Sequence, residues 1–212
     1  MSGNPFIEII RAVQLNGYDL LIKAPRRPEG LAERFFGSAD MHILRKCPCP
    51  VWMDSPESVH PYRNIVAAVD PVDQASAGLN RLIMDLGSSP AEGESATLHV
   101  VHAWRLEGES MLASGRTRIS AAELRELLSS AERGHKRKFD ELLVDYGLRS
   151  ESAHVNLIKE TASKAITSLC EAVKADLIVM GMRGLGEMAG MLLGSVSYKV
   201  NHLAPCTCIA VR

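Results

Sequence analysis

Residues 175–197 read ADLIVMGMRGLGEMAGMLLGSVS, and this stretch decides the fold. Asp176 to Gly181 is a short apolar run with branched residues, which is typical of a strand buried on both faces. Glycines follow, and Gly194 opens a helix that ends at Leu203. Glycines let backbone amides approach an anion, and a helix N-terminus offers unpaired N–H groups, so the order predicts a phosphate site. Alternatively, the glycines serve tight turns and close helix–strand packing. No Gly-Lys-Ser/Thr follows, which excludes a P-loop.

Similar strands alternate with helices upstream. We expect strands at 64–70, 96–103, 154–158, 176–181 and 206–211, with helices at 79–86, from Ser120 to the stop at Gly147, at 162–173 and at 194–203. Residues 88–93 are expected to form a loop, and Ser120 with Glu123 a capping box. The alternation predicts an α/β fold: an open, mainly parallel five-stranded sheet with helices on both faces.

An internal repeat without gaps extends this pattern. Asp19 corresponds to Asp176 and Gly37 to Gly194 at one offset of 157 residues, so residues 5–54 and 162–211 are two copies of one unit. We therefore expect a partial domain at 1–54, a linker at 55–61 and a complete domain at 62–212. The first copy corresponds to the carboxyl-terminal part of a domain and lacks the amino-terminal part. It is too small to bury an independent core. It must pack on the second domain or on a partner chain.

Composition and charge narrow the possible functions. The 212 residues are 46% hydrophobic, and 24 Lys and Arg balance 25 Asp and Glu, so no global field attracts a polyanion. No run approaches the ~18 apolar residues of a membrane span, which makes the cytoplasm the default compartment. The five cysteines are interpreted as reduced core thiols, and His99 and His102 as structural histidines. The basic run at 133–138 is expected to face solvent.

The segment Gly181-x2-Gly184-x9-Gly194-Ser195, with the strand before it and Ala204-Pro205-Cys206 after it, resembles the nucleotide-binding segment of universal stress proteins. The strands at 65–70 and 98–103 resemble that family too, so the likeness covers about 62–212. The whole chain is similar to a tandem universal stress protein that has lost most of its first domain.

The resemblance implies strand order 3-2-1-4-5, homodimers, and ATP, with or without Mg²⁺, where the strand order reverses. It implies that Asp70 bonds the ribose, that backbone at Ala68, Val69 and Ala103 borders the adenine, and that residues after the fourth strand take the phosphates. The full set of expected binding residues is Ala68, Val69, Asp70, Ala103, Met180, Gly181, Arg183, Gly184, Gly194, Ser195, Val196 and Ser197. Pro71 and Val72 depart from the family's usual small residues.

The first copy of the repeat is not expected to bind nucleotide. Ala24 and Arg27 stand at the positions of Gly181 and Gly184, and each brings a Cβ to where backbone must approach the phosphate. Asp40 replaces Ser197, and its charge repels an anion. We therefore expect one nucleotide per chain.

The resemblance, together with the glycine-rich segment, implies a cytoplasmic stress-response protein that binds ATP as a regulatory ligand. No general base, metal cluster or phosphate-bridging Lys stands beside the glycines, so at most slow ATP hydrolysis is expected. The alternative is a dimeric interaction or scaffold protein of the same fold that binds no nucleotide. An adenylate-transferring enzyme ranks third. The homodimer is expected through the uncharged edge strand at 206–211.

Overall fold

The computed structural model describes residues 5–25, 38–54, 58, 60–114, 119–182, 195–203 and 206–211. Its helices and strands alternate along the chain, which is the pattern expected of an α/β fold. Within the described residues, no helix is both long enough and apolar enough to cross a membrane.

One seven-stranded sheet runs through the protein, in the order β1-β2-β7-β6-β3-β4-β5. Five of its strands belong to the carboxyl-terminal part: β3 (Asn64–Ala68), β4 (Thr97–Trp104), β5 (Val155–Lys159), β6 (Leu177–Gly181) and β7 (Thr207–Val211). They are mutually parallel and adopt the expected order 3-2-1-4-5. The strand count differs from five because β1 (Leu21–Lys23) and β2 (Val51–Met53) join the same sheet.

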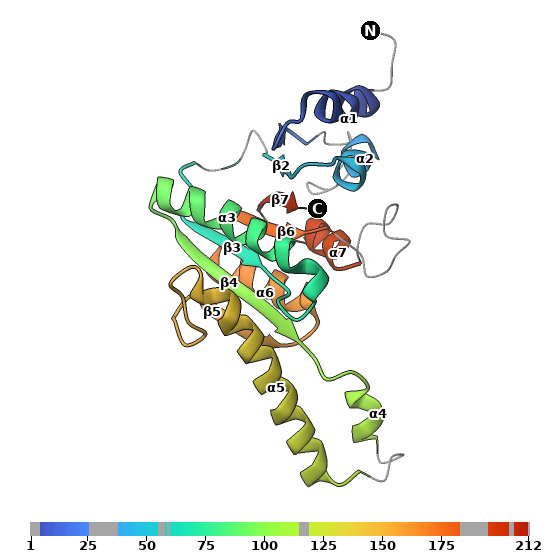
Figure 1. Ribbon diagram of the computed structural model, residues 1–212, viewed down its shortest axis with the longest axis vertical. Helices are drawn as coiled ribbons and strands as arrows, with labels where there is room; N and C mark the ends of the chain where they lie inside the picture. Colours follow the sequence, from blue (N-terminus) through green and yellow to red (C-terminus); the bar gives the residue numbers. More distant parts are fainter. Residues whose placement is uncertain are drawn as a thin grey trace.

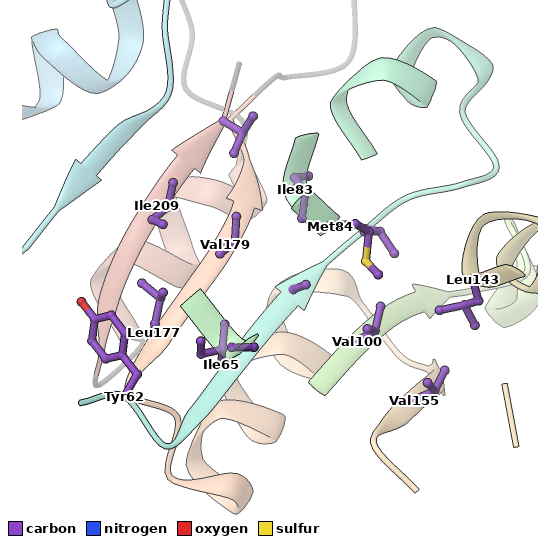
Figure 2. Close-up of a cluster of buried hydrophobic side chains, with 14 of the residues drawn as sticks. Tyr62, Ile65, Ile83, Met84, Val100, Leu143, Val155, Leu177, Val179 and Ile209 are labelled. Atoms are coloured by element: carbon purple, nitrogen blue, oxygen red, sulfur yellow. The ribbon is translucent and has the colours of Figure 1, made fainter. Parts of the chain in front are cut away.

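Helices cover both faces of this sheet, with α3 (Ala77–Glu94) in front and α6 (Ala162–Val173) behind in Figure 1. On the α3 face, Ile83 and Met84 join Phe139 of α5 (Ala121–Val144) and side chains of the strands in one buried cluster, shown in part in Figure 2. The opposite cluster holds Ile166 of α6 and Val200 of α7 (Ser195–Leu203). The central strand β3 is buried on both faces, which explains its unbroken apolar run.

Helix α3 is longer than expected, and the predicted loop at 88–93 is wrong. The helix runs through Pro90 to Glu94 and stops where Ser95 adopts a left-handed conformation, with φ 57°. Proline costs a helix one hydrogen bond, but buried Met84, Gly87 and Ala91 continue the three- and four-residue spacing across it. A Cβ at Gly87 would lie 3.2 Å from Leu98 Cδ1. Close packing on the sheet therefore outweighs the local turn signal.

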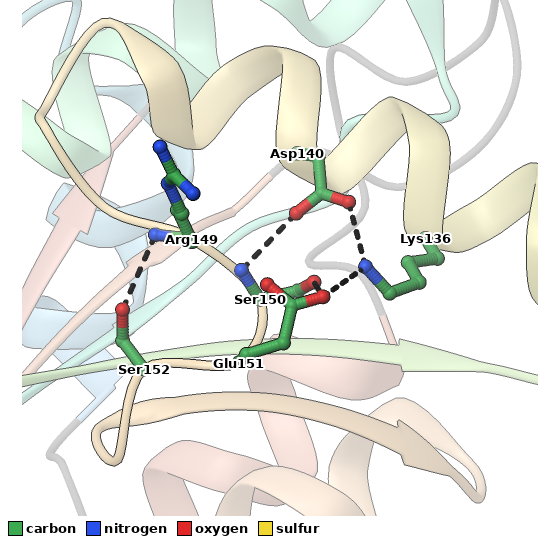
Figure 3. A network of polar contacts seen from close by, with 6 residues as sticks. All are labelled: Lys136, Asp140, Arg149, Ser150, Glu151 and Ser152. Atoms are coloured by element: carbon green, nitrogen blue, oxygen red, sulfur yellow. Dashed lines mark hydrogen bonds and ion pairs between the residues drawn. The ribbon is translucent and has the colours of Figure 1, made fainter.

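Helix α5 carries the expected capping box: the Ser120 hydroxyl accepts from the Glu123 N–H, and the Glu123 carboxylate accepts from the Ser120 N–H. Near the buried carboxyl-terminal end of α5, Lys136 Nζ lies 2.9 Å from Asp140 Oδ2 and 2.6 Å from Glu151 Oε1 (Figure 3). The Ser150 N–H donates to Asp140 Oδ1. This network fixes the loop before β5 to α5, and much of the basic run at 133–138 is paired on its own helix. The short α4 (Glu109–Ala113) and η1 (Gln74–Ser76) were not expected.

The amino-terminal elements repeat the carboxyl-terminal ones. Adding 157 to the bounds of α1 (Pro5–Asn16) and α2 (Ser38–Lys46) gives those of α6 and α7, and β1 and β2 fall within the matching ranges of β6 and β7. Figure 1 shows α1, α2 and β2 gathered beyond β7. The predicted repeat is therefore also a repeat of structure.

The first repeat docks on the second through β2, which pairs antiparallel with β7. Val51 lies opposite Ala210 and Met53 opposite Cys208. A third buried cluster fills the junction, in which Val13, Ile43 and Leu44 lie with Met182 and Ala210. Of the two expected docking sites, the first repeat thus uses the second repeat of its own chain. The expected homodimer interface at β7 needs correction, because β2 of the same chain occupies that edge.

Candidate functional site

The candidate site lies where the carboxyl ends of β3 and β6 meet. β3 pairs in parallel with β6 on one side and with β4 on the other, so that Ala68 lies between Met180 and Val101. The chain proceeds from β3 toward β4 and β5, whereas β6 proceeds to β7 in the opposite direction. In open α/β sheets, ligands bind beyond the carboxyl ends of the strands at such a reversal.

The turn after β3 is held by a buried amide. The Asp70 N–H donates to Asn80 Oδ1 at 2.9 Å, and Asn80 Nδ2 donates to the Asp70 carbonyl at 2.7 Å. The Val69 N–H donates to the Val101 carbonyl at 3.0 Å. The Asp70 side chain is exposed, while Asn80 is only 2% exposed. The backbone that carries the Asp70 carboxylate is therefore fixed while the carboxylate itself stays accessible.

Sequence reasoning missed Asn80. The signal was present, because Asn80 falls on the same helix face as Ile83, Met84 and Gly87, and all four are buried. A polar side chain in an apolar stripe needs a hydrogen-bond partner in the core. That partner is the turn that follows β3.

At the end of β6, Gly181 lies close to helix α3. An added Cβ would be 2.9 Å from Leu79 Cδ2 and 3.7 Å from Ile83 Cδ1. For this glycine, the packing role that the sequence left open is thus present. The Ser197 hydroxyl donates to the Gly181 carbonyl at 2.8 Å, which brings the first turn of α7 to the end of β6. The Ser197 proton is already engaged, so its backbone N–H is the donor that it can offer an anion.

The other expected residues are distributed as follows. Ala68 and Val69 are buried at the end of β3 and beyond it, and Ala103 is half-buried on β4. Met180 belongs to the core cluster that contains Ile178 and Val200, so its side chain serves packing. Ser195 and Val196 open α7. The predicted phosphate residues Arg183, Gly184 and Gly194 lie outside the described residues.

Two histidines lie beneath the Val69–Asp70 turn. His102 Nδ1 is 3.2 Å from the Val69 carbonyl, and His102 Nε2 is 2.9 Å from His135 Nδ1. Because a carbonyl only accepts, neutral His102 carries its proton on Nδ1 and accepts from His135 Nδ1–H. Burial lowers the pKa of both rings, and the Asp70 charge opposes the shift in each. The predicted structural role of His102 is confirmed, but its partner 33 positions away was not foreseen.

The first repeat carries an ion pair at the equivalent place. Asp40, which replaces Ser197, is fully buried, and Lys23 Nζ lies 2.6 Å from its Oδ1. Ala24, at the position of Gly181, brings a Cβ to this strand end. Arg27 lies outside the described residues. A buried carboxylate thus stands where the second repeat has a hydroxyl.

The cysteines lie in the interior, as expected. Cys47, Cys49, Cys170 and Cys208 are buried, and Cys206 is partly buried. Burial raises the pKa of Cys49 to about 12 and that of Cys208 to about 12. Thiols that stay protonated are poor nucleophiles and poor metal ligands. Across the described part of the chain, His, Cys, Asp and Glu side chains form no group of three that could hold a metal ion.

Comparison with known proteins gives a consistent result. The sequence model of the Universal stress protein family matches residues 1–54 and 61–212. Universal stress protein E of Escherichia coli (strain K12) is 27% identical over 221 residues, which cover 99% of this chain and 66% of that protein. A Thermus aquaticus relative, "Universal stress protein in QAH/OAS sulfhydrylase 3'region", is 32% identical over 151 residues, which cover 71% of this chain and 99% of the relative.

Among solved structures, the functionally unknown protein PA1789 from Pseudomonas aeruginosa PAO1 superposes with a TM-score of 0.78 at 21% identity. The superposition covers 99% of this chain and 68% of that one. The chain therefore spans about two thirds of the length of the Escherichia coli relative that it matches.

Proposed function

Because the chain belongs to the universal stress protein family, we propose that it is a stress-response protein that binds an adenine nucleotide, ATP, in its carboxyl-terminal repeat and acts in the cytoplasm as a nucleotide-dependent regulator. The observation that carries the proposal is the meeting of the fixed Val69–Asp70 turn with the end of β6 and the first turn of α7. Such a reversal point with a helix N-terminus suits a ligand that has an apolar part and a phosphate part.

The ribose, the adenine and the phosphates would each contact a different group of the described residues. The exposed Asp70 carboxylate would accept hydrogen bonds from ribose hydroxyls, as carboxylates do at the ends of strands in nucleotide-binding folds. Backbone at Ala68, Val69 and Ala103 would border the adenine. The N–H groups of Ser195, Val196 and Ser197, in the first turn of α7, would face the phosphates.

Phosphate binding also relies on Arg183, Gly184 and Gly194. Backbone amides at the glycines would replace part of the hydration of the phosphates, and Arg183 would balance charge. We assign no catalytic residue, and any Mg²⁺ would enter with the nucleotide. We expect a dissociation constant for ATP in the micromolar range.

A homodimer through β7 is expected only of a chain that lacks β2, because β2 occupies that edge in the full chain. The pairing of β2 with β7 is antiparallel and joins two copies of the same repeat. One chain therefore already contains the edge-to-edge contact that two complete domains would make.

The test is calorimetric titration of the full chain with ATP, together with mass spectrometry of the native protein for nucleotide retained in purification. Gly184→Asp should abolish binding, because it adds a side chain and a repelling charge to the phosphate segment. Gly134→Asp is the matched control, since Gly134 lies on α5 and an added Cβ there meets nothing within 4 Å. Unchanged affinity in Gly184→Asp would refute the phosphate assignment. No binding by the wild-type chain would leave the scaffold alternative.

A further inference from the structure

The two repeats differ in how their equivalent strands are covered. In the second repeat, β6 lies between β7 and β3, and its central residue Val179 is fully buried. In the first repeat, β1 pairs with β2, and within the described residues no strand lies on its other side. Ile22 corresponds to Val179 yet is 61% exposed. A large apolar side chain thus lies bare where the same repeat elsewhere buries its counterpart.

The backbone of this edge is also ready for pairing. The Leu21 N–H donates to the Pro50 carbonyl, and the Lys23 carbonyl accepts from the Asp54 N–H. Because polar groups of successive strand residues point to opposite sides, the N–H and carbonyl of Ile22 face away from β2. Parallel strands are rarely left uncovered, and a bare edge is a template for another strand.

An aspartate that both repeats carry just before the strand indicates which kind of strand would fit. Before β6, Asp176 Oδ2 accepts from the N–H groups of Arg63 and Asn64 at 2.7 and 2.9 Å, and the Asp176 N–H donates to the Asn64 carbonyl at 2.9 Å. One carboxylate thus anchors the first residues of the neighbouring parallel strand. Asp19 holds the same place before β1, is exposed, and has no hydrogen-bonded partner within the described residues.

The face above β1 points to a helix as well. Ile22 lies beside Trp52, which in turn lies beside Ile209, so the three side chains share one face of the sheet. Over β6 and β7 that face is covered by α3, whose Leu79 and Ile83 contact the end of β6. No helix within the described part of the chain covers it over β1.

We propose that the β1 edge is a docking site for a parallel β-strand followed by a helix, a unit of the kind formed by residues 60–94, supplied by another polypeptide. The strand would pair with Ile22 in the register that β3 adopts on β6, and its first N–H groups would bond to Asp19. The helix would cover Ile22 and Trp52. A second copy of this chain is a poorer occupant, because its own strand of this type is buried between β4 and β6. Two β1 edges related by a two-fold axis would run antiparallel and leave Asp19 without backbone donors.

The probe is a synthetic peptide with the sequence of residues 60–94, added to the full chain. The readout is amide hydrogen exchange measured by NMR. Docking should slow exchange of the Ile22 amide about tenfold or more at saturation, because that amide becomes hydrogen-bonded. The Ile22→Lys variant should lose peptide binding, and Asp19→Asn should weaken it about tenfold, the loss expected for charge-assisted bonds to backbone.

Two matched variants and one matched peptide are the controls. Leu15→Lys places the same charge on α1, where Leu15 is 81% exposed, and Glu126→Gln removes a carboxylate from exposed α5; both should bind like the wild type. A peptide with Val66→Pro should not dock, because proline disrupts the paired strand. All four protein variants change exposed side chains, so unchanged thermal unfolding is the check on folding.

Three results would overturn the proposal. The first is no protection of Ile22 with peptide up to about 1 mM, the weak end of specific affinity. The second is peptide binding that Ile22→Lys leaves intact, which would place the peptide elsewhere. The third is a dimer of the wild-type chain that Ile22→Lys dissociates in sedimentation experiments, because the edge would then be a contact between copies.

Discussion

The Asn80 side chain bonds both backbone polar groups of Asp70: its Oδ1 accepts from the Asp70 N–H at 2.9 Å, and its Nδ2 donates to the Asp70 carbonyl at 2.7 Å. Asn80 comes from the first turns of α3, and Asp70 follows β3. The pair therefore couples the packing of a helix to the position of an exposed carboxylate. If Asp70 binds ribose, stability and affinity should depend on the same amide.

Replacement of Asn80 by Ala should lower both quantities. Two hydrogen bonds disappear and the turn is left partly unpaired, so the free energy of unfolding should fall by about 2 kcal/mol. The affinity for ATP should fall as well, because the turn that carries Asp70 loses its anchor. Urea unfolding and calorimetric titration measure the two effects. Asn16→Ala removes an exposed side-chain bond on α1 and is the control. Full ATP affinity in a destabilised Asn80→Ala chain would show that the Asn80 amide does not support ATP binding.

Acid should destabilise the protein through three histidines, of which two are buried and one is half-buried. Burial lowers the pKa values of His99, His102 and His135 in the folded chain. The unfolded chain, with an ordinary histidine pKa near ~6.5, then binds more protons as the pH falls, so the free energy of unfolding decreases from about pH 6.5 downward until the folded-state pKa values are reached. Urea unfolding between about pH 7.5 and 5.5 measures this slope.

The variant that isolates the effect is His102→Asn, whose amide nitrogen can still donate to the Val69 carbonyl but does not titrate in this range. Its pH slope should be shallower than that of the wild type. Equal slopes in wild type and His102→Asn would contradict the assignment to this ring.

Deletion of residues 1–58 should convert the chain into a dimer. The deletion removes β2 and uncovers the β7 edge from Cys208 to Ala210, together with part of the third cluster. An uncovered, uncharged edge pairs readily with its own copy, and a two-fold axis gives the antiparallel arrangement that β2 now has. Sedimentation should give the monomer mass for the full chain and twice the mass of residues 59–212 for the shortened one. A shortened chain that stays monomeric at tens of micromolar would argue against it. Residues 1–58 alone should show no cooperative melting.

The Lys23–Asp40 pair should exclude a second nucleotide. Lys23→Ala removes one cation from the buried Asp40 carboxylate, which should lower the free energy of unfolding by about 2 kcal/mol, the usual worth of a hydrogen bond to a charged group. Asp40→Ser, which installs the residue of the second repeat, should cost less, because Lys23 is partly exposed. Titration of the wild-type chain with ATP should saturate at one nucleotide. A stoichiometry of two would show that the first repeat binds despite its carboxylate.

Features that depend on neighbours in sequence were predictable. The strands are short apolar runs between Gly, Pro and polar residues, the cap of α5 is a pair three residues apart, and the repeat is a constant offset. The order of the five carboxyl-terminal strands came from resemblance to a known family, and the structure has that order. Of the candidate site, the turn at Asp70 and the end of β6 were correctly brought together.

Tertiary packing decided the rest. Pro90 lies within α3 because Met84, Gly87 and Ala91 are all buried against the sheet, and this packing outweighs the local turn signal of the proline. Asn80 bonds Asp70, and His102 bonds His135, because different elements meet in the fold. The sequence does not show which residues of two such elements will lie opposite each other. The partner of β7 was open for the same reason, since an edge strand of neutral residues accepts any strand of matching geometry. The sequence by itself determined which elements form, because propensity and periodicity are local. Only the folded chain decided which edges they share, because the burial of each apolar face depends on all the other elements at once.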